Sequence, residues 1–299
     1  MTLEEQRKML GADGDIERDC ERIAREAAKL VLDRTEGAPS IAEMISDASE
    51  MNADEKQEVE KALALEREVE SNGNPAKMCE LADWIEAFTG FDDDEEQCRL
   101  MLNWNAKAAL AGAPAGMSAI GRAFDGWYGD AMLFDSEDEV DDDECLLQDD
   151  LIGAACELSA AKRGDSFGLL QWVSYYLGWK LEKPCERNFD KAMDCLVQLV
   201  ERSHAVNAGP TRRDIWAYQG ARQLEDLVKK APQQNEWDDC EYPFIFGLCY
   251  EKGWVLEKDL EKALAYYRMA AGFGHGRSKV AAKRVEEELV KTDRSEERR

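Results

Sequence analysis

Two nearly identical hexapeptides constrain the fold of this chain more than any other feature of its sequence. Residues 178–183 read GWKLEK and residues 253–258 read GWVLEK. On both sides of the second copy, apolar residues recur at the three- and four-residue spacing of an α-helix. Gly253 stands where a first helix must end, and Asp259 stands where a second helix must start. The pattern predicts a helix–turn–helix hairpin of about three dozen residues, repeated along the chain.

The complete repeat unit lies near the end of the sequence, and parts of it recur upstream. The last copy comprises Gly247, Tyr250, Gly253, Asp259, Lys262, Ala263, Tyr266, Tyr267, Ala270, Ala271 and Gly274. The upstream matches are Tyr175, Gly178, Asn188, Lys191, Ala192 and Cys195; Cys156, Ala160, Ala161 and Gly164; Trp104, Ala108, Ala109 and Gly112; and Gly121 with Phe124. The paired alanines predict that a neighbouring helix approaches closely.

These residues resemble the Sel-1-like repeat, a relative of the tetratricopeptide repeat. The match is good over residues 240–290, moderate over 150–205 and partial over 75–125. The resemblance implies an all-α fold, a right-handed α-solenoid of helix-turn-helix repeats that serves as a binding scaffold or adaptor. It implies no reaction. We expect Trp179 and Trp254 of the twin hexapeptides to pack between neighbouring hairpins; the alternative is that they form a ligand platform.

The repeats also set the expected domain organisation. We expect a charged N-terminal helical cap over residues 1–72, because an array's first unit needs a polar outer face. The repeat solenoid should follow over residues 73–290, with an acidic loop insertion at 134–150, and residues 291–299 should form a frayed tail.

Charge excludes some classes of partner. The chain carries 64 acidic and 38 basic side chains, for a formal net charge of −26. A phosphate backbone needs Lys and Arg to neutralise it, so we expect no direct nucleic-acid binding. An anionic membrane surface is disfavoured for the same reason. A basic protein partner would be attracted, although acidity also serves solubility alone.

Two acidic clusters fall in equivalent inter-helix turns of successive repeats, so both should project from one edge of the array. Their members, the candidate acidic edge, are Asp92, Asp93, Asp94, Glu95, Glu137, Asp138, Glu139, Asp141, Asp142, Asp143 and Glu144. Three interpretations stay open: a solvated loop, a docking surface for a basic protein, or a divalent-cation site. The spacing lacks the alternation and the glycine of an EF-hand loop, so we assign no metal ligands.

A second candidate surface is the concave face built from the first helices of the repeats. Tyr175 and Tyr250 occupy a repeat-defining position and should be buried. Aromatic residues off that position are candidates for exposed partner-binding anchors, since Trp and Tyr are enriched at interface hot spots. These are Trp127, Tyr128, Trp172, Tyr176 and Tyr242.

The sequence shows no catalytic set. Its two histidines, His204 and His275, should not meet in the repeat register, and the nine cysteines lack zinc spacing. The odd number of cysteines and the absence of a signal peptide or long apolar run favour reduced thiols in the cytoplasm. We expect no cofactor and no metal.

The function hypothesis is a non-enzymatic, cytoplasmic scaffold that binds another protein through its solenoid surface. The alternative is an acidic inhibitor or immunity-type protein that neutralises a basic partner, such as a toxin or a nucleic-acid-binding protein, through the acidic loops. A metal-binding or Cys/His-dependent enzyme is the weakest hypothesis. The oligomeric state is left open.

Overall fold

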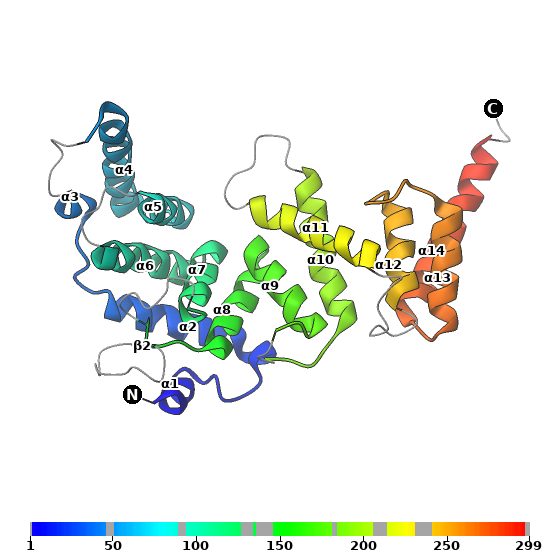
Figure 1. The fold of residues 1–299 in the computed structure, drawn as a ribbon, viewed down its shortest axis with the longest axis horizontal. Coiled ribbons are helices and arrows are strands. Elements are labelled where there is room, and N and C mark those ends of the chain that lie inside the picture. Colours follow the sequence, from blue (N-terminus) through cyan, green and yellow to red (C-terminus); the bar gives the residue numbers. More distant parts are fainter. Residues whose placement is uncertain are drawn as a thin grey trace. The chain divides into compact units, whose positions relative to one another are not determined.

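The computed structural model describes residues 2–45, 51–88, 94–126, 134–135, 146–180, 184–205, 214–230 and 241–296. The chain forms two compact units, Met1–Ala217 and Tyr218–Arg299, each described below by itself (Figure 1). None of the helices in these ranges is both long and apolar enough to span a membrane.

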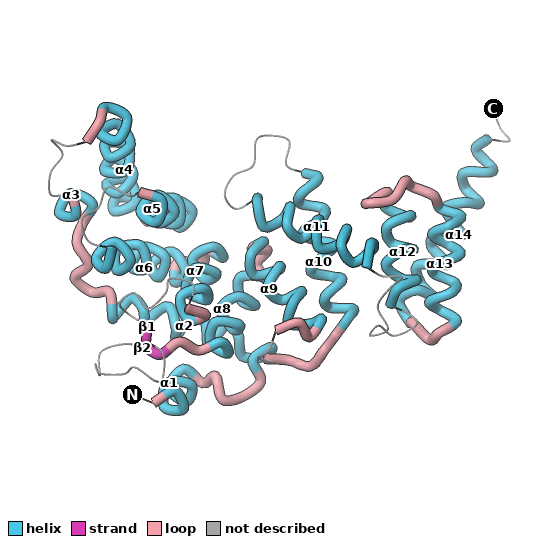
Figure 2. Tube along the Cα trace, viewed as in Figure 1, coloured by secondary structure: helices cyan, strands magenta, loops and turns pink. Residues whose placement is uncertain are grey.

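Unit 1 consists almost entirely of helices (Figure 2). They are α1 (Leu3–Leu10), α2 (Ile16–Arg34), α3 (Ile41–Met44), α4 (Ala53–Asn72), α5 (Pro75–Ala87), α6 (Asp94–Leu110), α7 (Pro114–Phe124), α8 (Asp150–Lys162), α9 (Ser166–Leu177) and α10 (Phe189–Ala205). Two strands of two residues, β1 (Phe134–Asp135) and β2 (Leu146–Leu147), pair in parallel. The all-α fold class is confirmed.

Consecutive helices from α4 to α10 each pack against the next one, which is the arrangement of an α-solenoid. Small residues make this packing close at two equivalent places. A Cβ atom on Gly116 of α7 would lie 2.7 Å from the Ala109 backbone nitrogen in α6. A Cβ atom on Gly168 of α9 would lie 2.9 Å from the Ala161 nitrogen in α8. Both contacts involve the predicted alanine pair, so the repeat register is the same in the two hairpins.

The N-terminal segment differs from the cap that we expected. Helix α2 packs against α6, α7 and α8 in the middle of the array (Figure 1). Its apolar stripe, which includes Cys20, Ile23 and Ala27, is completely buried. Because α2 has a strongly apolar face, it completes the core of unit 1 instead of covering one end of a stack.

Unit 2 contains the last hairpin. Helix α11 (Asp214–Lys230) crosses the boundary between the units and is followed by α12 (Glu241–Lys252), α13 (Leu260–Gly272) and α14 (Gly276–Glu296). Helix α13 packs against both α12 and α14. We expected fraying from residue 291, but α14 continues to Glu296.

The twin hexapeptides are the turns between paired helices. Gly178 and Gly253 end α9 and α12 with φ of +74° and +70°, a conformation in which a side chain is strained. Asp259 caps α13 by accepting the Lys262 N–H at 2.9 Å. Trp254 is buried as expected, whereas Trp179 is 52% exposed, so the expectation that both tryptophans pack between hairpins was wrong for Trp179.

Candidate functional site

A buried pair of carboxyl groups links α7 to α8. Glu157 on α8 is 0% exposed, and Asp125 directly follows α7 with a side chain 6% exposed. Glycines make the space for them: a Cβ on Gly121 would lie 3.0 Å from the Glu157 Cγ, and one on Gly153 would collide with the Asp125 carboxyl. No direct hydrogen bond reaches the four carboxyl oxygens from any other described group.

One cation and one phenol lie beside this pair. The Lys180 Nζ is 3.6 Å from the Asp125 Oδ2 and donates a hydrogen bond to the Tyr175 hydroxyl at 3.1 Å. Burial raises the pKa of Asp125 to about 6, against the opposing charge of Lys180. Burial, and then the Asp125 charge, raise the pKa of Glu157 well above its ordinary value. Burial therefore favours the protonated form of both carboxyl groups, and more strongly that of Glu157.

The last repeat carries different chemistry at the same two positions. In the repeat register Glu157 corresponds to Tyr267 and Asp125 corresponds to Glu251. The Tyr267 hydroxyl donates to the Glu251 Oε2 at 2.6 Å, and Arg284 pairs with the same carboxylate. A phenol such as Tyr267 is ordinarily protonated at neutral pH. A carboxyl such as Glu157 is ordinarily ionised there, so it can donate a hydrogen bond only if its pKa is raised. Sequence reasoning missed the pair, although an acid inside the apolar run LIGAACELSAA of α8 was a usable signal.

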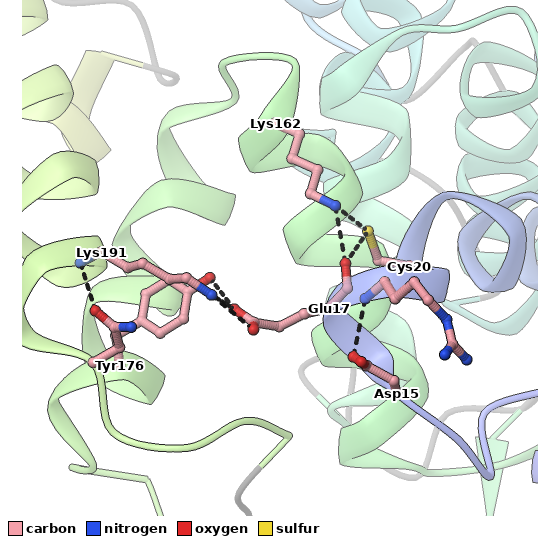
Figure 3. Close-up of polar contacts among 8 residues, drawn as sticks. Asp15, Glu17, Cys20, Lys162, Tyr176 and Lys191 are labelled. Atoms are coloured by element: carbon pink, nitrogen blue, oxygen red, sulfur yellow. Dashed lines mark hydrogen bonds and ion pairs between the residues drawn. The ribbon is translucent and has the colours of Figure 1, made fainter.

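Polar contacts hold α2 to the repeat helices (Figure 3). The Glu17 carboxylate accepts from the Tyr176 hydroxyl on α9 at 2.5 Å and from the Lys191 Nζ on α10 at 2.7 Å. The Lys162 Nζ at the end of α8 donates to the Glu17 carbonyl at 3.0 Å and lies 3.1 Å from the Cys20 Sγ. Helix α2 is thus tied to three helices of the array.

The structure corrects two of the predicted aromatic anchors. Trp172 is completely buried, and its indole N–H donates to the Ala154 carbonyl at 3.1 Å. Tyr176 is 5% exposed and is engaged by Glu17, so neither residue can anchor a partner. Both face inward because α2 and α8 cover the face of α9 that we expected to be open. Trp127 and Tyr128 lie outside the described residues, and of Tyr242 only the backbone, in α12, is described.

Most of the acidic edge lies outside the described residues. This holds for Asp92 and Asp93 and for the predicted set from Glu137 to Glu144. Helix α6 begins at Asp94, and Glu95 is exposed in its first turn. The end of the insertion is structural instead: the buried Asp149 caps α8 and accepts two hydrogen bonds from Arg7, at 2.7 and 3.1 Å.

A pocket that the sequence did not predict lies between the start of α4 and the end of α5. The half-buried rings of Trp84 and Phe88 stack with centroids 4.7 Å apart, in a pocket of about 650 Å³. Three exposed acidic residues, Asp54, Glu55 and Glu58, line the same pocket. We call this site the Trp84 pocket.

Unit 2 exposes large apolar side chains on its last two helices. Met269 on α13 and Phe273 directly after it are four residues apart, so they share a face, and they are 51% and 56% exposed. Val280 on α14, which packs against α13, is 69% exposed. These side chains give unit 2 an exposed apolar surface.

Several of the described thiols are held in their protonated form by burial. Burial raises the pKa of the Cys98 and Cys185 thiols to about 11 and that of Cys249 to about 12, so these thiols stay protonated at neutral pH. The His275 ring bonds to the Ser278 hydroxyl at 2.7 Å. Among the described residues, no group of three or more His, Cys, Asp or Glu side chains could hold a metal.

The chain has a distant similarity to two solved structures. No family model matches the chain, and no curated protein matches it. Among solved structures, it is similar to a protective antigen present in uropathogenic Escherichia coli strains displaying an SLR fold, with 16% identity and a TM-score of 0.33 over 75% of this chain and 44% of that one. It is also similar to a Sel1 repeat protein from Oxalobacter formigenes, with 12% identity and a TM-score of 0.35 over 74% of this chain and 85% of that one.

The chain spans less than half the length of the first of these proteins. Both TM-scores are low, so the fold description rests on the stacked hairpins, the glycine turns and the small-residue contacts in this structure. These features are those of an all-α solenoid of helix-turn-helix repeats.

Proposed function

We propose that this chain is a non-enzymatic, cytoplasmic scaffold that binds a basic segment of another protein at the Trp84 pocket. The observation that supports this proposal is the combination of a stacked aromatic pair with acidic side chains in one open pocket. An aromatic face attracts a Lys or Arg side chain, and neighbouring carboxylates add long-range attraction. The net charge of −26 favours the same class of partner.

The negative net charge also supports a version of this proposal in which the scaffold acts as an inhibitor of a basic protein. A partner drawn from a class of basic toxins or nucleic-acid-binding proteins would have its basic surface covered by the acidic residues near the pocket. Glu95 lies only seven residues after Phe88 in the sequence, so the predicted acidic edge continues from the pocket along the chain. Electrostatic binding of this kind weakens with salt, because the Debye length falls from about 10 Å at 0.1 M to about 3 Å at 1 M.

Affinity capture from the native host, with washes at low and high salt, tests the proposal. Trp84→Ala should lose the partner, and Asp54→Asn with Glu58→Gln should weaken its retention most at low salt. Trp179→Ala is the matched control, because it removes a tryptophan of unit 1 that does not line the pocket. If the Trp84 and Trp179 variants retain the partner equally, the Trp84 pocket is not the site.

The apolar face of unit 2 supports a second candidate, a scaffold that binds by hydrophobic contact. Met269 and Phe273 would then carry the binding, and a high-salt wash would leave the partner in place. Met269→Glu with Phe273→Glu should abolish capture, whereas Met9→Glu, at a residue 53% exposed in unit 1, should not. Loss of the partner in both variants would point to general insolubility instead.

A further inference from the structure

A lysine amine and a cysteine thiol from distant parts of the sequence meet at one point on α2. The Lys162 Nζ lies 3.1 Å from the Cys20 Sγ, and the two residues are 142 positions apart. Figure 3 shows the amine pointing at the sulfur from the last turn of α8. We propose that Cys20 and Lys162 form a reducible covalent cross-link, an S–O–N bridge, when the protein meets dioxygen.

The geometry fixes both reacting atoms. Lys162 is held by a second contact, because its Nζ also donates to the Glu17 carbonyl at 3.0 Å. The Cys20 Sγ contacts that same carbonyl at 3.6 Å, and the cysteine has no exposed surface. A flexible lysine normally samples many rotamers, whereas this one ends on a rigid helix next to a single thiol. The separation leaves room for one bridging oxygen atom between nitrogen and sulfur.

The bond changes balance with dioxygen as the only co-reactant. The thiol loses its proton, the neutral amine loses one of its two hydrogens, and the bond between the oxygen atoms breaks. One oxygen becomes the S–O–N bridge, and the other leaves as water with one hydrogen from the thiol and one from the neutral amine. Written for the neutral groups, R–SH + R′–NH₂ + O₂ gives R–S–O–NH–R′ + H₂O. Sulfur and nitrogen each lose two electrons, and dioxygen gains four.

The environment favours this product over the usual fates of an oxidised cysteine. An exposed fraction of 0% keeps bulky thiols such as glutathione from Cys20, while dioxygen is small and apolar. The Lys162 side chain is exposed on its other side, so the proton released from nitrogen can reach water. The bridge would fasten α2 to α8 and close a loop of 142 positions, which restricts the unfolded chain and so raises the unfolding temperature of unit 1.

Mass spectrometry of the full chain tests the proposal. Protein purified under reductant should be compared with the same protein held in oxygenated buffer at pH 9. We expect the oxidised sample to gain one oxygen and lose two hydrogens, and its digest to contain one cross-linked peptide pair with Cys20 and Lys162. Treatment with dithiothreitol should return both peptides, and the unfolding temperature should fall with the loss of the bridge.

Variants separate this product from its rivals. Cys20→Ser and Lys162→Arg should lack the bridge, while Lys191→Arg, at the other lysine near Glu17, and Cys156→Ser should form it as the wild type does. A wild-type chain that stays reduced, or that forms a Cys20 sulfinic acid, a disulfide or a direct S–N bond, would overturn the proposal. Circular dichroism confirms that each variant is folded before its mass is compared.

Discussion

Replacing Glu157 by glutamine should make unit 1 more stable at neutral pH. The native state keeps a proton on this buried carboxyl, whereas the unfolded chain releases it above its ordinary pKa of about 4.3. Glutamine has nearly the same shape, and its amide N–H can donate to Asp125 without having to retain a proton. The variant therefore lacks the free-energy cost of protonating this carboxyl on folding.

The magnitude follows from the linkage between proton binding and folding. Between pH 4.3 and the native pKa, the native state binds one proton more than the unfolded state, so stability falls as pH rises. Each pH unit costs about 1.4 kcal/mol, so while Glu157 stays protonated the cost reaches about 4 kcal/mol at pH 7 and about 2 kcal/mol at pH 5.5. The advantage of the variant should follow that line and vanish near pH 4.

Urea unfolding followed by circular dichroism, repeated from pH 4.5 to pH 8, measures this advantage. The two units can unfold separately, so the comparison uses the transition that Glu157→Gln shifts. Glu60→Gln on α4 is the control, because that carboxyl is exposed and its replacement should move the midpoint little at any pH. An advantage that is absent at pH 7, or that does not shrink as the pH falls, would refute the protonation of Glu157 in the native state.

Four further substitutions test packing, backbone strain and capping, each by the shift of the urea midpoint. Gly153→Ala should cost about 1–3 kcal/mol because its Cβ would collide with Asp125, whereas Gly272→Ala, with nothing within 4 Å, should gain up to about 1 kcal/mol. Val255→Gly should raise the free energy of unfolding by about 1 kcal/mol. A valine at φ +60° is strained by about 1–3 kcal/mol, and the larger conformational entropy of glycine in the unfolded chain offsets part of the relief. Asp149→Ala should cost about 2–4 kcal/mol, because α8 loses its cap and an α1 arginine loses its buried partner. A change in stability of the same sign for both glycine variants would contradict the packing argument. An unchanged midpoint for the Val255 variant would contradict the strain argument, and an unchanged midpoint for the Asp149 variant would contradict the capping argument.

The repeat hairpins could be predicted because their signals are local. Gly253, Asp259 and the alanine pair act within one or two helical turns, and the structure has each in its expected role. Exposure could not be predicted in the same way. Tyr176 and Trp172 look like surface residues on their own helix, but α2 and α8 cover them, and α2 is more than 130 positions away in the sequence.

The candidate sites depended even more on distant contacts. Trp84 on α5 stacks on Phe88, the residue directly after that helix, yet the acidic side of their pocket comes from α4. Lys162 and Cys20 belong to no recognisable sequence motif. Their amine and thiol come together only because two helices that are distant in the sequence pack against each other. Glu157 is the exception. An acidic residue within an apolar helix is visible in the sequence, whereas its partner Asp125 is not.

The shared register of the hairpins has a consequence for how such a chain can change. From Gly121 to Glu157 there are 36 positions and from Gly247 to Tyr267 there are 20, yet each pair meets across its hairpin. Lengthening a flexible connection threefold or fourfold costs only about 1 kcal/mol of closure entropy. The α7–α8 turn is therefore a position where segments of new length and charge can be accepted, lost or grafted, while the helices that flank it keep their places.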